Sequence, residues 1–464
     1  MHHAATPNLR IASQPSVCPK TEGWPLVGAI PSLMHSSFGF FEHARKRYGD
    51  IYTLDLGFAQ IIMLGHPKHA QHVLCDNAQN YVKRGPLWTN VKQLIGNGLV
   101  SSEGDFWLRQ RRMMQPHFHQ ERLSAIAELM TEAAEEEIAS WVVPSQTVDS
   151  RSTVDLMHTF NQMAMRVIVR TMFGTSLCTE QMDEIGRAIS RAWDHLFLTM
   201  FGNKLPGWLP VLGGQRFQSD LETYNSAVYQ IIDEQRRNPN GKNHLLALLL
   251  DAVDEESGEG MSDKQLRDEV ATLFVAGFET STIALAWSVY FLAKYPAIQR
   301  RVEEEVERVL GGRRPTFADL PHLTYTRMVL QESIRLCPPA WFTPRLAAED
   351  DVIDGYHIPA GSNIGILKFM IHRHPDFWHQ PEKFDPERFS PEHSAARHRY
   401  AWVPFGAGQR ICIGREFALM EGQLTLAMFV QRFQAYPIDG YEPKLKLSGT
   451  LTTSNGIRVR LARR

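Results

Sequence analysis

Hydrophobic residues between about residues 120 and 310 recur every three to four positions, which is the spacing of helices that bury one face. Phe38–Tyr48 has the same spacing. Shorter segments bounded by glycine and proline instead have the pattern of strands: Ile51–Leu56, Gln60–Leu64, Asp351–Ile366 and the chain after Pro437. We therefore expect a mainly α protein with a small β region, in which both ends of the chain form one small sheet.

The amino-terminal part of the chain differs in composition from the rest. Residues 1–35 are rich in proline and glycine, which predicts a lead-in segment that packs on the surface. No internal repeat follows. We expect residues 36–464 to form a single domain, with β-rich parts near 50–65, 351–366 and 437–464.

One predicted helix is unusually long and apolar. Ser262 and Gln265 fit a capping box at its start, and Pro296 ends it just beyond Lys294. The middle is apolar on all sides, so the helix is expected to lie buried and to cross the domain over roughly 50 Å. The carboxylate of Glu279 near its centre would be costly in lipid, which argues against a membrane span.

The centre of this helix also holds Gly277 and Thr280. Gly277 weakens the helix, and the Thr280 hydroxyl can bond back to the carbonyl of Ala276 and open a local bulge. On these residues alone, a satisfied core threonine and a glutamate that reaches the surface is the simpler interpretation.

Composition and charge narrow the range of possible functions and locations. Lysine and arginine number 49 against 51 acidic residues, so nothing in the charge balance favours nucleic acid as a partner. The five cysteines are scattered and odd in number, which is typical of a reducing cytosol. The first residues contain no apolar run of signal-peptide or anchor length. We therefore expect a soluble cytoplasmic protein without a membrane anchor.

A glycine-rich loop near the carboxyl end carries the strongest candidate chemistry, Phe405-Gly-Ala-Gly-Gln-Arg-Ile-Cys412-Ile-Gly414. Its glycines let backbone approach a flat, bulky group. A helical pattern follows at Glu416–Phe429, so Cys412 lies near a helix amino terminus, where its thiol pKa should fall. A thiolate beside Arg410 suits a metal or an anionic cofactor, whereas a lone loop cysteine is more often an inert buried thiol.

The complete loop resembles, without a departure, the haem-binding loop of the cytochrome P-450 superfamily, Phe-x-x-Gly-x-Arg-x-Cys-x-Gly. The resemblance implies that family's fold, with the long central helix crossing over the haem, and the function of a haem-thiolate monooxygenase. It implies haem b as cofactor, Cys412 as the axial thiolate that binds the iron, and Phe405, Arg410 and Gly414 as parts of the haem-binding loop.

A second segment resembles the family's Glu-x-x-Arg helix. Glu332 and Arg335 have this spacing, which recurs elsewhere in the chain at Glu42/Arg45, Glu184/Arg187, Glu234/Arg237 and Glu305/Arg308. What selects Glu332 and Arg335 is the downstream Phe384–Phe389 segment, whose Arg388 is implied to join them in a buried network beneath the haem loop.

Ala276–Ser281 resembles the family's oxygen-activation segment, which reverses the simpler interpretation of the central helix. The resemblance implies that Glu279 and Thr280 form a catalytic acid–alcohol pair that relays protons, and that Ala276 and Gly277 border the haem. Trp107 and Arg111 resemble the helix that bonds a haem propionate, and Arg345 and Arg410 match two further propionate contacts.

The implied reaction inserts one atom of O2 into a C–H bond of a hydrophobic small molecule such as a terpene, fatty acid or steroid. Segments that usually wall the substrate pocket are Leu87–Leu99, Trp193–Trp208, Ala340–Thr343 and Leu451–Thr452. The apolar side chains that they supply to this wall are Trp88, Leu94, Phe197, Met200, Phe201, Trp341 and Phe342. Lys83 and Arg84 could hold a substrate carboxylate, although a solvated loop is the simpler interpretation.

No fused reductase module is expected, because the chain stops about fifty residues after Cys412. Electrons should therefore come from a separate ferredoxin or flavodoxin-type protein, and we expect a monomer. Arg109, Arg112 and Arg415 could offer a basic docking patch, with ordinary surface charge as the alternative.

Three other functions remain open at this point. A haem-thiolate peroxygenase or isomerase would use peroxide, but such relatives tend to lose the acid–alcohol pair. A haem-binding carrier or sensor would need no proton relay. A zinc site at His372, His374 and His379 is the third, and its uneven spacing is weak support.

Overall fold

The computed structural model describes residues 15–141, 153–202, 214–237, 244–254, 256 and 258–464. The α-helices are α1 Ile30–His35, α2 Ser37–Tyr48, α3 Pro67–Gln71, α4 Pro86–Ile95, α5 Gly104–Met114, α6 Gln120–Ser140, α7 Leu156–Phe173, α8 Thr179–Gly202, α9 Gly214–Arg237, α10 Leu245–Asp251, α11 Asp263–Lys294, α12 Pro296–Leu310, α13 Thr324–Leu336, α14 Lys368–Ile371, α15 Pro391–Ala396 and α16 Arg415–Arg432. Short 3-10 and π turns are η1 His72–Asp76, η2 Ala78–Asn80, η3 Gln115–Phe118, η5 Phe317–His322, η6 Pro386–Phe389, η7 Arg399–Ala401 and η8 Gly408–Arg410.

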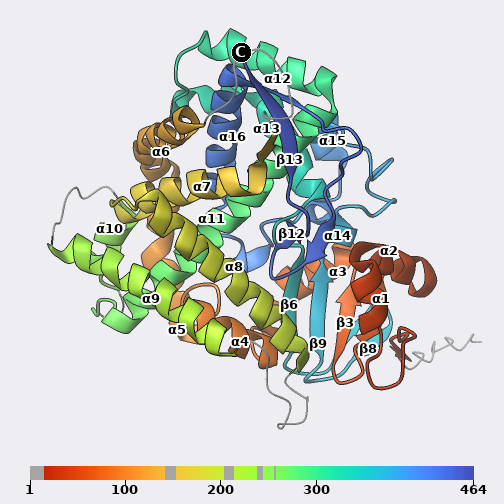
Figure 1. The fold of residues 1–464 in the computed structure, drawn as a ribbon. Coiled ribbons are helices and arrows are strands. Elements are labelled where there is room, and N and C mark those ends of the chain that lie inside the picture. The colour runs from red at the N-terminus through yellow and green to blue at the C-terminus, as the bar shows by residue number, and fades with distance from the viewer. Residues whose placement is uncertain (1–14, 142–152, 203–213, 238–243, 255, 257) are drawn as a thin grey trace, which may run out of the picture.

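The strands are short; β3, β6, β8 and β9 lie beside α1 and α2, whereas β13 runs among the helices at the carboxyl end of the chain (Figure 1). In chain order, the strands are β1 Ser16–Val17, β2 Ile51–Asp55, β3 Gln60–Leu64, β4 Tyr81–Val82, β5 Thr153–Asp155, β6 Phe342–Ala347, β7 Asp351–Ile353, β8 Tyr356–Ile358, β9 Asn363–Leu367, β10 Phe433–Tyr436, β11 Leu445–Leu447, β12 Leu451–Thr453 and β13 Arg458–Arg463. The protein is thus mainly helical with a small β region, as the sequence predicts.

Helix α11 runs through the middle of the helical part and has the predicted ends. The Ser262 hydroxyl accepts a hydrogen bond from the backbone N–H of Gln265, and Pro296 opens α12. At 1.5 Å per residue its 32 residues span about 48 Å. The helix is long and apolar enough to cross a membrane, but 67% of its most apolar window is buried against the rest of the protein. Its apolar surface therefore belongs to the core.

The strand pairings overturn one prediction, that both chain ends share a sheet. The largest sheet has the order β2-β3-β9-β6-β4, and β13 lies instead between β10 and β5 in a separate sheet. Strand β3 pairs in parallel with β9, so that Ile62 faces Ile364. Pairing partners some 300 residues apart leave no local pattern in the sequence, which is why the prediction failed.

The described part of the proline- and glycine-rich lead-in, residues 15–35, contains turns and surface contacts. Bridges join Lys20 to Thr53 and Trp24 to Gly28, and α1 forms before residue 35. Trp24 and Leu26 are exposed, whereas Leu33 is buried against the main core. The segment therefore lies against the β2–β3 hairpin and is anchored at α1.

Candidate active site at the cysteine loop

The loop that carries Cys412 is a compact turn held by its own backbone. The N–H of Cys412 donates to the carbonyl of Phe405 over 2.9 Å, and Gly414 is the N-cap of α16. Gly408 has φ +65°, and a Cβ on it would lie 2.0 Å from the carbonyl oxygen of Leu74. Glycine is therefore required at residue 408 both by the left-handed backbone and by the neighbouring chain.

The side chain of Cys412 is surrounded by protein atoms but still has accessible surface. Burial raises the pKa of its thiol, against the opposing effects of the Gly414 N–H and the charges of Lys368, Arg111 and Arg415. The expectation of a lowered thiol pKa is thus wrong for the protein alone, because burial outweighs the helix terminus. Coordination to a metal ion would remove the thiol proton despite this burial.

A buried ion-pair network supports the loop from below. Arg335 and Glu332 are both 0% exposed and form two hydrogen bonds, of 2.6 and 2.8 Å. Arg388 lies 3.4 Å from the same carboxylate. The network predicted from the Glu-x-x-Arg spacing therefore exists, whereas Glu305, in another copy of that spacing, bonds the start of α13 instead.

The network reaches the cysteine loop through one histidine. Arg335 donates to the carbonyl of His372 over 2.8 Å, and the Nε2 of His372 accepts the backbone N–H of Val403 over 3.0 Å. Val403 precedes the loop by two residues, and its carbonyl accepts the N–H of Gly406. A rigid path therefore runs from α13 to the turn that presents Cys412.

A cluster of buried cations lies beside the loop, which we call the basic cluster: Lys83, Arg345 and Arg410. Lys83 and Arg345 are 9% and 7% exposed. Burial lowers the pKa of both Arg345 and Arg410 to about 10. The carboxylate that faces them is Glu103, which accepts from Arg410 over 2.9 Å. Burial and the two neighbouring arginines lower the pKa of Lys83 well below its ordinary value. Three basic groups thus face one carboxylate, and a ligand with two negative charges would favour the protonated form of all three.

Trp107 and Arg111 lie on α5 and contact the cysteine loop directly. The Arg410 guanidinium stacks 3.7 Å from the centre of the Trp107 ring. Arg111 donates to the carbonyl of Ile411 over 3.0 Å and to the side chain of Gln115. The residues predicted from the helical spacing are thus brought to the loop, and Arg111 binds its backbone.

The predicted oxygen-activation segment has the expected local bond. The hydroxyl of Thr280 donates to the carbonyl of Ala276 over 2.7 Å, while α11 continues without interruption. Ala276 is exposed and Thr280 half-buried on a helix whose other central residues are mostly buried. A Cβ on Gly277 would lie 2.5 Å from Cδ1 of Ile168, so this glycine allows α7 to pack closely.

Glu279 is not bonded to Thr280. Its Oε1 accepts a 2.8 Å hydrogen bond from the hydroxyl of Thr450, between β11 and β12. Burial raises the pKa of Glu279 to about 7, opposed by the Thr450 bond and reinforced by the charge of Asp194. A carboxyl group with a pKa near neutrality can both take up and release protons, which is the property a proton relay needs.

A groove of about 800 Å³ opens beside the basic cluster, between the β2–β3 hairpin, the start of α4 and strands β6 and β9. Its wall is largely apolar, with Trp88 and Phe342 among the lining residues, and Arg345 lies along it. These two predicted wall residues therefore border a groove that reaches the basic cluster.

Other predicted wall residues lie elsewhere. The indole of Trp341 donates to the carbonyl of Ser448 over 3.0 Å and packs against Phe38 and Phe41, and it is not among the residues that line this groove. Leu94 is 0% exposed in the main core. The side chains of Phe197, Met200 and Phe201 lie outside the described residues.

The structure changes the interpretation of two groups of charged residues that the sequence analysis singled out. Lys83 is buried, with Nζ 2.6 Å from the carbonyl of Val100, whereas Arg84 is exposed as a solvated loop residue would be. Of the proposed docking arginines, Arg109 and Arg112 lie against Asp254, and Arg415 pairs with Glu416. The three arginines are therefore neutralised in part by this chain's own carboxylates.

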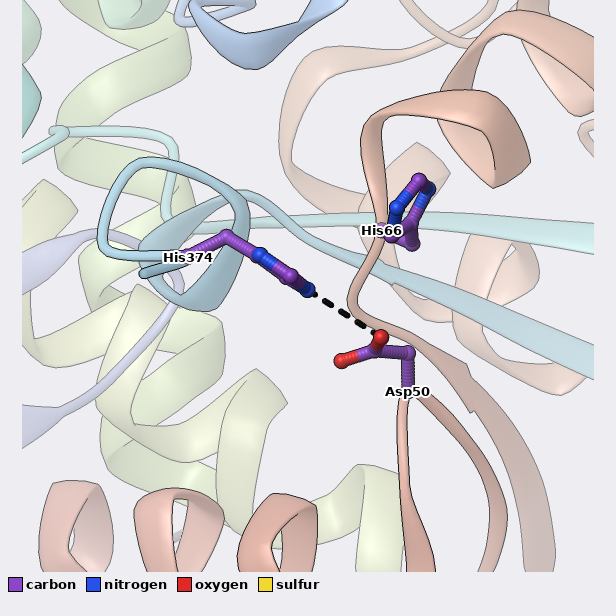
Figure 2. A group of neighbouring side chains, drawn as sticks. All are labelled: Asp50, His66 and His374. Carbon is purple, nitrogen blue, oxygen red and sulfur yellow. Dashed lines mark hydrogen bonds and ion pairs between the residues drawn. The ribbon is translucent and has the colours of Figure 1, made fainter. Parts of the chain in front are cut away.

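The predicted histidine group does not come together as expected. His372 bonds Val403, and His374 instead lies beside Asp50 and His66 (Figure 2). In both His374 and His66, Nδ1 accepts a backbone N–H, so each Nε2 carries its proton, and that of His374 donates to Asp50 over 3.1 Å. Hydrogen bonding accounts for these side chains.

Sequence reasoning missed Glu103, Thr450 and Lys368 as parts of the site. Thr450 bonds Glu279, Glu103 faces the basic cluster, and the Nζ of Lys368 donates to the carbonyl of Pro404 over 3.0 Å. The one available signal was a lysine in an otherwise apolar run at 366–371.

Comparison with known proteins shows similarity to the cytochrome P450 family along almost the entire chain. A family model described as "Cytochrome P450" matches residues 18–461. "Cyclooctatin synthase" and "Cyclooctat-9-en-7-ol 5-monooxygenase" of Streptomyces melanosporofaciens are each 32% identical, over 93% and 90% of this chain and 92% and 89% of their own lengths. "Pentalenene oxygenase" of Streptomyces avermitilis is 29% identical over 95% of this chain and 96% of its own.

A solved structure extends the agreement to the fold. The heme domain of cytochrome P450DA superposes with a TM-score of 0.86 at 28% identity, covering 97% of this chain and 98% of that one. The fold class and enzyme class predicted from the cysteine loop are thus confirmed. The protein belongs to the cytochrome P450 family of haem-containing monooxygenases.

Proposed function

We propose that this protein binds haem b through Cys412 and inserts one atom of O2 into a C–H bond of a terpene-class hydrocarbon. The observation that carries the proposal is that the Cys412 loop lies beside the basic cluster, in which three basic side chains face the single carboxylate of Glu103. Haem b carries two propionates, so charge and ligand chemistry both fit the residues present.

Each part of the site has a proposed task. Cys412 would bind the haem iron, and Lys83, Arg345 and Arg410 would hold the propionates. Trp107 orients Arg410 by stacking, and Arg111 fixes the loop backbone at Ile411. When bound, the haem supplies the oxygen-activating chemistry, for which the thiolate is the electron-donating ligand.

We propose that residues of α11 transfer protons and leave room for O2 and substrate. Ala276 and Thr280 present accessible surface, so O2 and substrate are expected to meet this face of the helix. The hydroxyl of Thr280 holds a proton at the Ala276 carbonyl, and Glu279 exchanges protons with solvent. Gly277 sets the depth of α11 through its packing on Ile168.

The substrate class is inferred from the groove and from relatives. The groove at Trp88 and Phe342 is largely apolar, which favours a hydrophobic substrate. Two relatives are named for oxygenating cyclooctat-9-en-7-ol and pentalenene. A terpene with few polar groups fits both observations.

Electrons are proposed to come from a separate ferredoxin or flavodoxin-type protein, with the enzyme a soluble cytoplasmic monomer. The first test is the absorption spectrum of the dithionite-reduced protein with and without carbon monoxide. A strongly red-shifted Soret band, absent in Cys412→Ala, is expected. A well-folded protein that takes up no haem would overturn the proposal.

The presence of both Glu279 and Thr280 favours a monooxygenase over a peroxygenase or a carrier. Screening terpenes, fatty acids and steroids for a substrate-induced shift of the Soret band then tests the substrate class. Turnover with peroxide but not with an electron donor would instead indicate a peroxygenase.

A further inference from the structure

The turn between β11 and β12, residues 448–450, connects helix α8 to the central helix α11. At one end of the turn, the hydroxyl of Thr450 donates to the carboxyl group of Glu279 on α11 over 2.8 Å. At the other end, the hydroxyl of Ser448 donates to Oδ1 of Asp194 on α8 over 3.0 Å. Only Gly449 separates the two contacts, so the position of the Thr450 hydroxyl is tied to that of α8.

Two further contacts fix the turn on the side of α8. The Nζ of Lys446, in β11, lies 2.8 Å from Oδ2 of Asp194, so both oxygens of this half-buried carboxylate hold the hairpin. Gly449 packs against the indole of Trp193, because a Cβ on this glycine would lie 2.6 Å from Cε3 of the ring. Adjacent residues of α8 therefore hold adjacent residues of the turn.

The position of the Thr450 hydroxyl matters because few groups stabilise the Glu279 carboxylate. Burial raises the pKa of Glu279 to about 7, the Thr450 bond lowers it, and the charge of Asp194 raises it. Among the described residues, Asp194 is the charged group that acts on Glu279 from α8, and Lys446 of β11 pairs with it. The Oε2 of Glu279 is buried without a hydrogen-bond partner there. Loss of the Thr450 bond would therefore weaken the ionised form.

We propose that Asp194 is a positioning residue for Glu279. Its carboxylate holds the turn between β11 and β12, in which the hydroxyl of Thr450 meets the Glu279 carboxyl group. Trp193–Trp208 is a predicted segment of the substrate wall, so the turn would connect that wall to the acid. The inference rests on the proposed function, in which Glu279 exchanges protons.

Two neutral variants at residue 194 separate charge from position. Asp194→Asn removes the charge but retains an oxygen that can accept from Ser448, whereas Asp194→Ala removes both. The direct effect of the lost charge on Glu279 is the same in the two variants, so a difference between them comes from the contact with the turn. Glu184→Gln and Glu184→Ala are the matched control pair, because Glu184 is exposed on the same helix.

The protonation of Glu279 is measured directly on the full-length haem-loaded protein. The measurement is the carboxyl C=O stretch in infrared difference spectra recorded across the pH range, and the band that Glu279→Gln lacks belongs to this residue. Product formed per electron consumed is recorded over the same range. The infrared midpoint is read without turnover, so it does not depend on the electron donor.

The Thr450 hydroxyl stabilises the ionised carboxylate, so loosening the turn should raise the pKa of Glu279. We expect the midpoint of Asp194→Ala to lie about half a pH unit above that of Asp194→Asn, roughly a threefold difference in proton affinity. The effect should be partial, because the N–H of Leu451 still donates to the carbonyl of Pro339 over 2.9 Å. In a Thr450→Val background the difference should vanish.

Coinciding midpoints in Asp194→Ala and Asp194→Asn would overturn the inference, as would a difference that persists in the Thr450→Val background. If Asp194→Ala does not fold, Ser448→Ala breaks the same hydrogen bond and leaves the charge in place. Its midpoint should lie above that of the wild type, and an unchanged midpoint would contradict the inference. Glu184→Gln and Glu184→Ala should both titrate as the wild type.

The two proposals fail differently. A wild-type protein without the thiolate signature contradicts the proposed haem ligand, and a Glu279→Gln variant with full turnover contradicts the proposed relay. If both parts of the proposed function hold and the two neutral variants at residue 194 titrate alike, only the role of Asp194 is wrong.

Discussion

The hydroxyl of Thr450 donates a 2.8 Å hydrogen bond to the carboxyl group of Glu279. Thr450 lies at the turn between β11 and β12, and Glu279 lies in the middle of α11. The other carboxyl oxygen, Oε2, is buried and has no hydrogen-bond partner among the described residues. A single hydroxyl thus helps set the proton affinity of the acid proposed for the relay.

The pH dependence of turnover should follow Glu279. Its pKa is about 7, and the protonated form delivers the proton, so product formed per electron consumed should fall as the pH rises through about 7. The Thr450 bond lowers this pKa, so Thr450→Val should raise it and move the falling arm to higher pH. Product and electron consumption are measured across the pH range.

Two further variants serve as the test and the control for this pH experiment. Glu279→Gln should remove this arm and lower turnover by roughly 10²–10⁴-fold, the usual contribution of a proton-transfer group. Ser454→Ala, at an exposed position just beyond β12, should leave the profile unchanged. A falling arm that persists in Glu279→Gln would assign it to another group.

Substitution by alanine should destabilise the protein at one glycine of the cysteine loop and have little effect on stability at another. Gly408→Ala places a Cβ 2.0 Å from the Leu74 carbonyl oxygen at a positive φ, so it should lower the free energy of unfolding by at least ~1–3 kcal/mol. Gly414 has φ −85°, and a Cβ on it would meet no atom of the surrounding chain within 4 Å, so Gly414→Ala should fold normally. Denaturant titration of both variants checks this pair, and equal effects would contradict the loop geometry.

The basic cluster predicts a contrast between adjacent residues. Lys83→Met removes one of the three basic groups and should weaken haem retention by roughly 10- to 100-fold, since hydrogen bonds to charged groups contribute about 1.5–3 kcal/mol. Arg84→Met, at an exposed position, should retain haem as the wild type does. The rate of haem transfer to an acceptor protein measures both, and equal rates would exclude Lys83 as a propionate contact.

The ion pair between Glu332 and Arg335 should be essential for stability. Arg335→Met leaves a fully buried carboxylate without its bidentate partner, which should cost about 3–5 kcal/mol. Arg335→Lys should rescue little, because an ammonium group cannot form the same fork. By comparison, Glu42→Gln breaks a pair with Lys46 whose side chains are both more than half exposed, so it should change stability by less than ~1 kcal/mol.

Local chemistry explains what could be predicted. The ends of α11 follow from Ser262 and Pro296, and the Thr280 bond to Ala276 follows from a spacing of four residues. The cysteine loop was recognisable because its glycines, arginine and cysteine are close together in the chain. In each case the interacting groups are near neighbours, so the order of residues alone contains the information.

The sequence by itself determined the helical character, the central helix, the Cys412 loop and the family. The tertiary structure alone decided that Lys83 is buried while Arg84 is solvated, that β3 pairs with β9, and that Glu279 bonds Thr450. Burial and charge pairing depend on residues as much as 300 positions apart, which no local pattern encodes. The chemistry of the site was therefore visible in residue types, whereas its electrostatic balance arose only on folding.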